Sequence, residues 1–258
     1  MVELAPNTSK YRCFYFMSPK EALQILGGYY RCPRKMLPDG TEQFLGPLVL
    51  YTSQDEDGKR HVGFEYVDCT VLVPKTPALH AVVERLYSDI IRLPYKQRPR
   101  ALLCGIPTGG KILTEEMKFR NLHPSENHLS LLEETRGRRE KQFVFTPGSR
   151  LPEAGDEIVV VEDVCNTFSS TIKAIKLVEG CGARVTMVSC FLNRSSPTRE
   201  VIEVDGREIP VRALWTEPMP VYRQDDPRVR GLIKIGGIVG NPKAKWGRLV
   251  RIMREHSA

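Results

Sequence analysis

The sequence lacks several features that mark whole classes of protein. No apolar run approaches the roughly 20 residues that a membrane-spanning helix needs. The first residues, 1–7, have neither the basic start nor the apolar stretch of a secretory signal peptide. The chain also shows no internal repeat. We therefore expect a cytoplasmic protein with no membrane partner.

Cysteine is present, but not in a pattern that forms a disulfide framework or binds zinc. The seven cysteines are an odd number, and no two are spaced as Cys-x-x-Cys. Cys69, Cys104 and Cys190 lie in apolar, strand-like runs, where a reduced thiol is commonly buried. Cys165 stands near a predicted helix N-terminus, which can lower a thiol pKa, but no histidine neighbours it in the sequence. We expect reduced, structural cysteines.

The composition is that of a globular protein with a basic balance. The 258 residues are 41% hydrophobic and 27% charged, enough for one large α/β domain or a core with a small cap. A net charge of +7 suits nucleic acid, a membrane surface or a polyanionic small molecule. The basic residues look scattered rather than gathered in one run, which favours the small anion over nucleic acid.

Strand and helix patterns alternate between residues 76 and 192. Towards the N-terminus, a capping box at Ser18 and Glu21 predicts the start of a short helix, and residues 62–73 carry a strand signal that ends at Val71-Leu-Val73. Between 76 and 192, strands are predicted at 101–106, 158–162 and 184–192, with weaker strands at 128–132 and 142–145, and helices at 76–91, 109–121 and 170–179. This alternation predicts an α/β fold with a doubly wound, mainly parallel sheet. We expect an N-terminal hood over 1–75, a core over 76–195 and a C-terminal extension over 196–258. The extension should contain a hairpin turning at Asp205-Gly206 and a basic amphipathic helix over 244–256.

The most informative segment is 158–171, with the sequence IVVVEDVCNTFSST. Its β-branched run is typical of a strand buried on both faces, and it leads directly into Glu162 and Asp163. Two carboxylates there need solvent, a metal or hydroxyl groups, because unpaired burial is costly. The polar residues that follow stand at a predicted helix N-terminus, which attracts anions. A sugar phosphate fits both features; a plain strand–helix turn is the alternative.

This segment resembles the phosphoribosyl-pyrophosphate (PRPP) motif of type I phosphoribosyltransferases, a hydrophobic strand followed by two acids and a phosphate loop. The resemblance implies that Glu162 and Asp163 hold the ribose hydroxyls and that the loop binds the 5′-phosphate. The loop residues are Asn166, Thr167, Phe168, Ser169, Ser170 and Thr171. Phe168 replaces the glycine usual in the family. We therefore expect either an ordinary backbone conformation in the loop or weaker phosphate binding.

A second segment, Gly105-Ile-Pro-Thr-Gly-Gly-Lys111, follows another predicted strand. Such a turn can present consecutive N–H groups to an anion. It resembles the pyrophosphate loop of the same family, which implies binding by Thr108, Gly109, Gly110 and Lys111. An ordinary turn is the alternative, and the role of Lys111 stays open because Gly109 falls where orotate enzymes often have lysine.

The basic segment Arg136-Gly-Arg-Arg-Glu-Lys141 resembles the flexible catalytic loop of orotate phosphoribosyltransferases, without the histidine usual a few residues later. The resemblance implies that Arg138, Arg139 and Lys141 offset charge on the leaving pyrophosphate. A solvated charge run is the alternative.

Two segments resemble the base site of orotate enzymes. Arg194 ends a predicted strand, as the base-binding arginine of that family does, although Asn193 replaces the usual acid. Its guanidinium suits a planar carboxylate such as that of orotate. Residues 58–68 look like a diverged base-site segment, in which Phe64 and Tyr66 pack near the base or, equally, in the core.

The resemblance implies transfer of a phosphoribosyl group from PRPP to a nitrogenous base, orotate first among the candidates, with release of pyrophosphate. It implies Mg²⁺ held mainly by the diphosphate, with no separate protein metal site. It also implies a homodimer, because in this family the catalytic loop often completes the neighbouring subunit's site. A phosphoribosyltransferase for another base and a non-catalytic regulator that senses PRPP or a nucleotide are the alternatives.

Overall fold

The computed structural model describes residues 14–40, 42–90, 101–136 and 140–256, and it divides into two compact units. Unit 1 is Met1–Ala22 with Leu72–Pro218, and unit 2 is Leu23–Val71 with Met219–Ala258. The contacts therefore divide the chain differently from the expected boundaries at 75 and 195. Both units combine segments that are distant in the sequence.

Unit 1 is built on a seven-stranded sheet in the order β12-β13-β11-β10-β7-β8-β9. The strands are β7 (Ala101–Gly105), β8 (His128–Arg136), β9 (Glu140–Phe145), β10 (Glu157–Cys165), β11 (Arg184–Asn193), β12 (Val201–Val204) and β13 (Arg207–Thr216). The five inner strands pair in parallel, and the two edge strands pair antiparallel. The predicted α/β fold with a mainly parallel sheet is confirmed.

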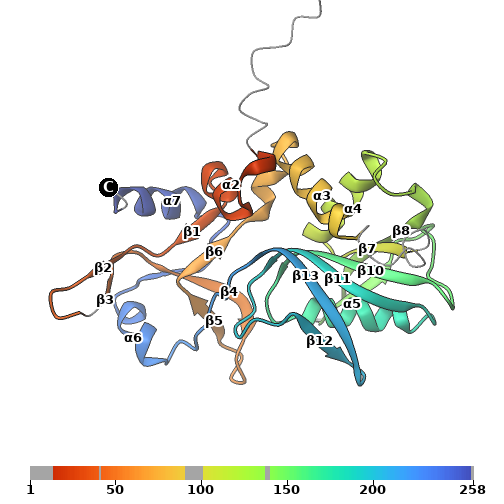
Figure 1. Ribbon diagram of the computed structural model, residues 1–258. Coiled ribbons are helices and arrows are strands. Elements are labelled where there is room, and N and C mark those ends of the chain that lie inside the picture. The colour runs from red at the N-terminus through yellow and green to blue at the C-terminus, as the bar shows by residue number, and fades with distance from the viewer. Residues whose placement is uncertain (1–13, 41, 91–100, 137–139, 257–258) are drawn as a thin grey trace, which may run out of the picture. The chain divides into compact units, whose positions relative to one another are not determined.

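Helices cover both faces of this sheet. They are α3 (Thr76–Ile90), α4 (Gly109–Phe119) and α5 (Ser169–Glu179), with a short 3₁₀ turn, η2 (Ser125–Asn127). In Figure 1, α3 and α4 lie on one face and α5 lies on the other. The sheet is therefore doubly wound, as the alternating pattern predicted.

The core of unit 1 centres on β10. Ile158, Val159, Val160 and Val161 are all fully buried, as expected for a strand covered on both faces. Burying one such side chain contributes about 1.5–3 kcal/mol. This run therefore holds the end of β10, and the acids beyond it, in a fixed position.

The chain reverses direction in the sheet between β7 and β10. From β7 the chain passes through α4 to β8 on one side, and from β10 it passes through α5 to β11 on the other. Neighbouring strands whose connections diverge in this way leave a crevice at their carboxyl ends, where ligands bind in open α/β sheets. The loops after β7 and β10 meet at this point.

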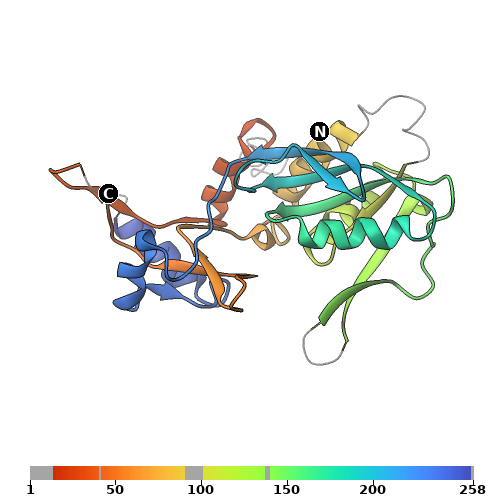
Figure 2. The same ribbon diagram turned by 90° about the horizontal axis from the view of Figure 1, so that it is seen from below.

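Strands β8 and β9 form an antiparallel hairpin in which Thr135 pairs with Lys141. Figure 2 shows the described ends of both strands reaching beyond the rest of unit 1. Only short strands, 128–132 and 142–145, were predicted here. Pairing between β8 and β9 extends both strands beyond the residues whose own composition favours a strand.

Unit 2 combines the N-terminal strands with the C-terminal tail. Its elements are the end of α2 (Pro19–Leu26), β1 (Tyr29–Arg31), β2 (Arg34–Met36), β3 (Glu42–Phe44), β4 (Leu48–Gln54), β5 (Arg60–Gly63), β6 (Glu65–Val67), most of the 3₁₀ turn η1 (Cys69–Leu72), α6 (Pro227–Lys234), β14 (Ile238–Val239) and α7 (Trp246–Glu255). Strand β14 pairs in parallel with β4. Buried tail residues Val229, Val239 and Leu249 belong to the cores of this unit. The tail is therefore part of the fold of unit 2, whereas the predicted hairpin β12–β13 belongs to unit 1.

One predicted strand is wrong. The strand signal over 62–73, which ended at Val71-Leu-Val73, is divided into β5, β6 and η1. The Asp68 carboxylate accepts hydrogen bonds from the Thr70 N–H at 3.0 Å and the Thr70 hydroxyl at 2.6 Å. Such local bonds stabilise a turn and end the extended backbone.

The remaining predicted elements agree with the structure. Ser18 and Glu21 form the expected capping box at the start of α2, with the Ser18 N–H donating to Glu21 at 2.9 Å and the Glu21 N–H donating to Ser18 at 3.2 Å. Across the described parts of the chain, the helices are too short or too polar to cross a bilayer.

Candidate active site

The two loops at the switch point touch through Asp163 and Gly109. An ideal β-carbon built on Gly109 would lie 2.1 Å from both Cγ and Oδ2 of Asp163, closer than real side chains approach. Only glycine at 109 leaves room for the carboxylate where it stands. The acid at the end of β10 therefore lies against the first turn of α4.

Two more glycines allow α4 to approach the sheet. A β-carbon on Gly110 would lie 2.1 Å from the Val161 carbonyl oxygen, and one on Gly105 would lie 2.4 Å from the Thr114 hydroxyl. The Ile106 N–H donates to the Val161 carbonyl at 2.9 Å, which joins the two strand ends. Gly105 was not singled out as a site residue, although a glycine at the end of a buried strand was a signal for this close approach.

The two acids differ in their surroundings. Glu162 is 7% exposed, and burial, together with the adjacent Asp163 charge, raises the pKa of its carboxyl well above the usual value. Its Oε1 accepts the Asp163 N–H at 3.3 Å. Asp163 is half-buried, and its Oδ1 accepts the Val164 N–H at 2.9 Å. Asp163 is thus the more accessible member of the pair.

The backbone of Phe168 forms part of the loop, whereas its ring packs in the core. Its φ is +62° and its ψ is 11°, the left-handed conformation that glycine adopts most easily. Of the two expected alternatives, the ordinary backbone is therefore wrong, and weaker phosphate binding stays a prediction. The ring is 2% exposed and packs in the core with residues that include Cys165 and Ile175. Its burial there offsets the cost of the left-handed backbone and keeps the ring out of the solvent-facing side of the loop.

The polar residues around Phe168 are accessible, with one exception. Thr167, Ser169 and Ser170 are exposed, and the Thr167 and Ser169 hydroxyls are 2.8 Å apart. Asn166 is half-buried. Thr171 is 2% exposed and its hydroxyl bonds the Cys165 thiol, so it lies beneath the loop. Exposed hydroxyls beside the N-terminus of α5 form a suitable place for an anion.

Cys165 is a structural thiol, as predicted. It is 1% exposed, and its hydrogen bond with Cys190 and its burial raise its pKa well above the usual value. Such a thiol carries little thiolate, the nucleophilic form. The six cysteines in the described part of the chain are all free, as expected for reduced thiols.

The basic residues predicted for catalysis are only partly described. Arg138 and Arg139 lie outside the described residues, and for Lys141 the structure describes only the backbone, in β9. Lys111 lies in the first turn of α4 and its N–H donates to the Ile106 carbonyl at 2.9 Å. Thr108, the residue before α4, is exposed.

Arg194 lies beside the start of the loop at 166–171. It is 4% exposed, and its N–H donates to the Cys165 carbonyl at 2.8 Å, which joins the ends of β11 and β10. Asn193 is used in the local turn: its amide nitrogen donates to the Arg199 carbonyl at 2.8 Å, and its oxygen accepts the Ser195 hydroxyl at 2.8 Å.

Phe64 and Tyr66 are found in unit 2 and pack with other aromatic rings. Phe64 stacks on Phe44 at 4.2 Å between ring centroids and meets Tyr222 edge-on at 5.5 Å. Tyr66 lies 5.9 Å from Trp246. These contacts match the core-packing alternative, and a role at the base is left as a proposal.

The described side chains are compatible with a magnesium ion that is held mainly by the phosphates of a bound substrate. Within the described ranges, no three His, Cys, Asp or Glu side chains are grouped to hold a metal ion. Mg²⁺ commonly binds through one or two carboxylates together with substrate phosphates. Asp163, the more accessible of the two acids, provides a carboxylate of this kind beside the proposed phosphate sites.

Comparisons with known proteins agree with the motif. No family model matches the chain. A segment of 62 residues is 39% identical to the orotate phosphoribosyltransferase of a Bradyrhizobium species, and it covers 24% of this chain and 32% of that protein. The chain therefore matches about a third of that relative's length.

Solved structures of similar proteins have low sequence identity. The orotate phosphoribosyltransferase of Aeropyrum pernix is 17% identical with a TM-score of 0.48, over 85% of this chain and 98% of the other. The adenine phosphoribosyltransferase of Trypanosoma brucei is 12% identical with a TM-score of 0.45, over 83% and 82%. By its β10–α5 motif and its 62-residue match, the chain resembles the type I phosphoribosyltransferases, in particular orotate phosphoribosyltransferase.

Proposed function

We propose that the protein transfers the 5-phosphoribosyl group from PRPP to a nitrogenous base and releases pyrophosphate, with orotate as the favoured base. The observation that carries the proposal is the contact of Asp163 with Gly109. It brings an acid suited to ribose hydroxyls against a turn suited to the diphosphate. The anchored loop at 166–170 then stands beside them for the 5′-phosphate.

The proposed reaction needs positioning and charge stabilisation rather than a nucleophile. The bond from C1 of the ribose to the diphosphate oxygen breaks, a bond from C1 to the base nitrogen forms, and the proton of that nitrogen passes to the released pyrophosphate or to solvent. Positive charge develops on the sugar, and negative charge develops on the diphosphate. Fixed dipoles and charges that match this distribution lower the barrier.

Asp163 is assigned to the ribose hydroxyls, because it is the accessible acid at the end of β10. Glu162 lies behind it and supports its position through the Asp163 N–H. The exposed hydroxyls of Thr167, Ser169 and Ser170 are assigned to the 5′-phosphate. The turn Thr108–Lys111 is assigned to the diphosphate. Bound Mg²⁺ would neutralise charge on that group.

Orotate is favoured by the position of Arg194 next to the phosphate loop. The guanidinium fork of an arginine matches a planar carboxylate on the base. Asn193 is engaged in the local turn and is not needed for this assignment. Arg138, Arg139 and Lys141 keep their proposed role at the pyrophosphate, and the proposed assembly is a homodimer.

Calorimetric titration of PRPP with Mg²⁺ tests the binding step. Asp163→Asn should weaken PRPP binding by about tenfold or more, about 1.4 kcal/mol. Asp205→Asn makes the same chemical change at the exposed tip of the β12–β13 hairpin and should leave binding unchanged. No detectable heat with PRPP at about millimolar concentration, which corresponds to binding weaker than about 4 kcal/mol, would contradict the proposal.

A turnover assay with a panel of bases then separates an enzyme from a regulator. Pyrophosphate release with orotate, but not without a base, supports the favoured reaction. PRPP binding with no turnover of any base supports the regulator instead. Arg194→Met keeps the volume of the buried side chain, and it should abolish use of orotate while sparing a base that lacks a carboxylate.

A further inference from the structure

The excess positive charge of the chain lies in one segment of unit 2. Residues 227–256 contain eight basic residues and one acidic residue, a balance of +7, and the net charge of the whole chain is also +7. The other residues hold 30 basic and 30 acidic side chains and are therefore balanced, so the basic residues are scattered as expected but their net excess is local. Charge gathered on one segment creates a local potential that attracts anions.

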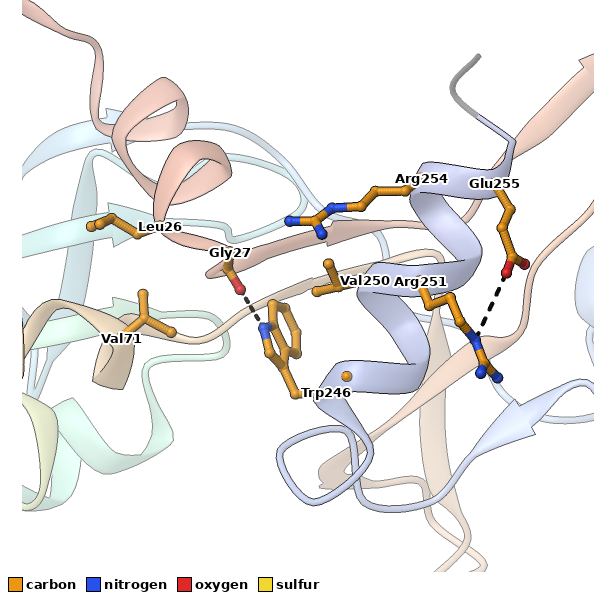
Figure 3. Close-up of a pocket in the computed structure, with 9 residues that line it drawn as sticks. Leu26, Gly27, Val71, Trp246, Val250, Arg251, Arg254 and Glu255 are labelled. Atoms are coloured by element: carbon orange, nitrogen blue, oxygen red, sulfur yellow. Dashed lines mark hydrogen bonds and ion pairs between the residues drawn. The ribbon is translucent and has the colours of Figure 1, made fainter.

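A pocket of about 490 Å³ lies beside helix α7 in this segment. Figure 3 shows it between the end of α2, Val71 and the face of α7 that begins at Trp246. Its volume is in the range of sites that bind small molecules. Leu26, Val71, Trp246 and Val250 give it an apolar floor.

A hydrogen bond and close backbone packing hold the walls of the pocket together. The Trp246 indole N–H donates to the Gly27 carbonyl, so α7 is attached to the end of α2 (Figure 3). A β-carbon on Gly28 would lie 2.5 Å from Val71 Cγ2 and 2.8 Å from the Asp68 carbonyl, so this backbone also packs closely on the η1 turn. A pocket held in this way needs little reordering before a ligand binds.

The two arginines on the rim differ in their ion pairing. The Arg251 Nε lies 3.8 Å from Glu255 Oε1, so its charge is partly matched within the rim. The Arg254 side chain extends over the apolar floor toward Gly27 (Figure 3). Among the residues that the structure describes, Arg254 has no ion-pair partner. The rim therefore offers one unmatched positive charge above an apolar surface.

We propose that this pocket binds a small amphiphilic carboxylate, at a site separate from the proposed active site. The apolar body of the ligand would lie on Trp246 and Val250, and its carboxylate would pair with the Arg254 guanidinium. The planar fork of arginine matches a carboxylate through two parallel hydrogen bonds. A monoanion fits the single unmatched charge, whereas a dianion would leave one charge uncompensated near apolar atoms.

The fluorescence of Trp246 provides a direct test with 3-phenylpropanoate as the probe. Trp215, the other tryptophan, is replaced by phenylalanine so that the signal comes from the pocket alone. The probe should change the emission at sub-millimolar to millimolar concentration, and its neutral analogue 3-phenylpropanamide should bind about tenfold more weakly. PRPP should not compete with the probe.

Two matched variants separate charge from packing. Arg254→Gln should reduce affinity for the carboxylate about tenfold and leave the amide unaffected, while Arg251→Gln should change either affinity less than about threefold. Both side chains are exposed, so both variants should fold. Equal binding of carboxylate and amide, no loss in Arg254→Gln, or no response at about 20 mM probe would overturn the proposal. Tighter binding of phenyl phosphate than of the carboxylate would overturn the monoanion assignment.

Discussion

The carboxylate of Asp163 lies directly against the α-carbon of Gly109, in the space that a side chain at 109 would occupy. These residues are more than fifty positions apart: Asp163 lies near the end of β10, and Gly109 begins α4, which follows the neighbouring parallel strand β7. The contact joins the segments that follow β7 and end β10 into one candidate site, and substitutions at these residues test it.

Gly109→Ala should disturb the site without adding charge. The new methyl group would overlap Asp163 Cγ, so the carboxylate must move. We expect PRPP affinity to fall about tenfold or more in calorimetric titration. Gly231→Ala is the control, because a β-carbon there meets no atom within 4 Å. Unchanged PRPP affinity in Gly109→Ala would show that this contact does not contribute to PRPP binding.

Phe168 should tolerate glycine at least as well as alanine. Loss of the buried ring costs about 3–5 kcal/mol in Phe168→Ala. Phe168→Gly removes one more carbon, but glycine adopts the left-handed backbone conformation without the cost of about 1–2 kcal/mol that a residue with a β-carbon has. Urea unfolding, followed by Trp215 fluorescence in a Trp246→Phe background, should show equal or smaller destabilisation for glycine.

Phe191 is the matched control for that comparison. It is 1% exposed and lies in β11, where the backbone is extended. Glycine there should be more destabilising than alanine by about 0.5–1 kcal/mol. If glycine is also the worse replacement at 168, the left-handed backbone is not a significant cost.

Glu162→Gln should change how stability depends on pH. Burial raises the pKa of Glu162 in the folded state above its value in the unfolded chain. Between those two values the folded state binds a proton that the unfolded state lacks, so this stability is present at low pH and is lost as pH rises through the folded pKa. Glutamine does not titrate, so the Glu162→Gln protein does not lose this stability as the pH rises.

The unfolding free energy of Glu162→Gln, relative to the unchanged protein, should therefore increase as the pH rises above 4.5, the ordinary pKa of a Glu carboxyl. Urea unfolding at a series of pH values measures it. Glu200→Gln, at an exposed position, should show no such trend. A constant difference between Glu162→Gln and the unchanged protein would mean that the carboxyl titrates normally.

Thiol labelling should follow exposure. Cys181 is exposed, whereas burial raises the pKa of Cys32 to about 11 and that of Cys104 to about 12. In a Cys13→Ser background, a thiol-specific chromogenic reagent should label Cys181 first, and Cys181→Ser should remove the fast phase. Fast labelling of Cys165 in the folded protein would contradict its buried position.

Local sequence was enough to predict most elements of unit 1. The β-branched run before Glu162, the helical spacing in 76–90 and the Asp205-Gly206 turn each act over a few residues, and each forms as predicted. The alternation of strands and helices predicted the parallel sheet, whereas the order of its strands is known only from the structure.

Long-range packing decided the rest. The tail after 219 joins the N-terminal strands because Val229, Val239 and Leu249 are buried among them, and no local pattern reveals which distant surface an apolar residue will meet. The left-handed backbone of Phe168 was also hidden from sequence, because its cost is offset by a ring in the tertiary core.

Sequence by itself determined the strand, the acid pair and the polar loop, since these depend on residue type and spacing along one short segment. Tertiary structure alone decided that Gly109 gives room to Asp163, that Glu162 is buried while Asp163 is accessible, and that Arg254 extends over an apolar pocket. The physical reason is that close approach and burial depend on atoms contributed by segments that are far apart in the chain.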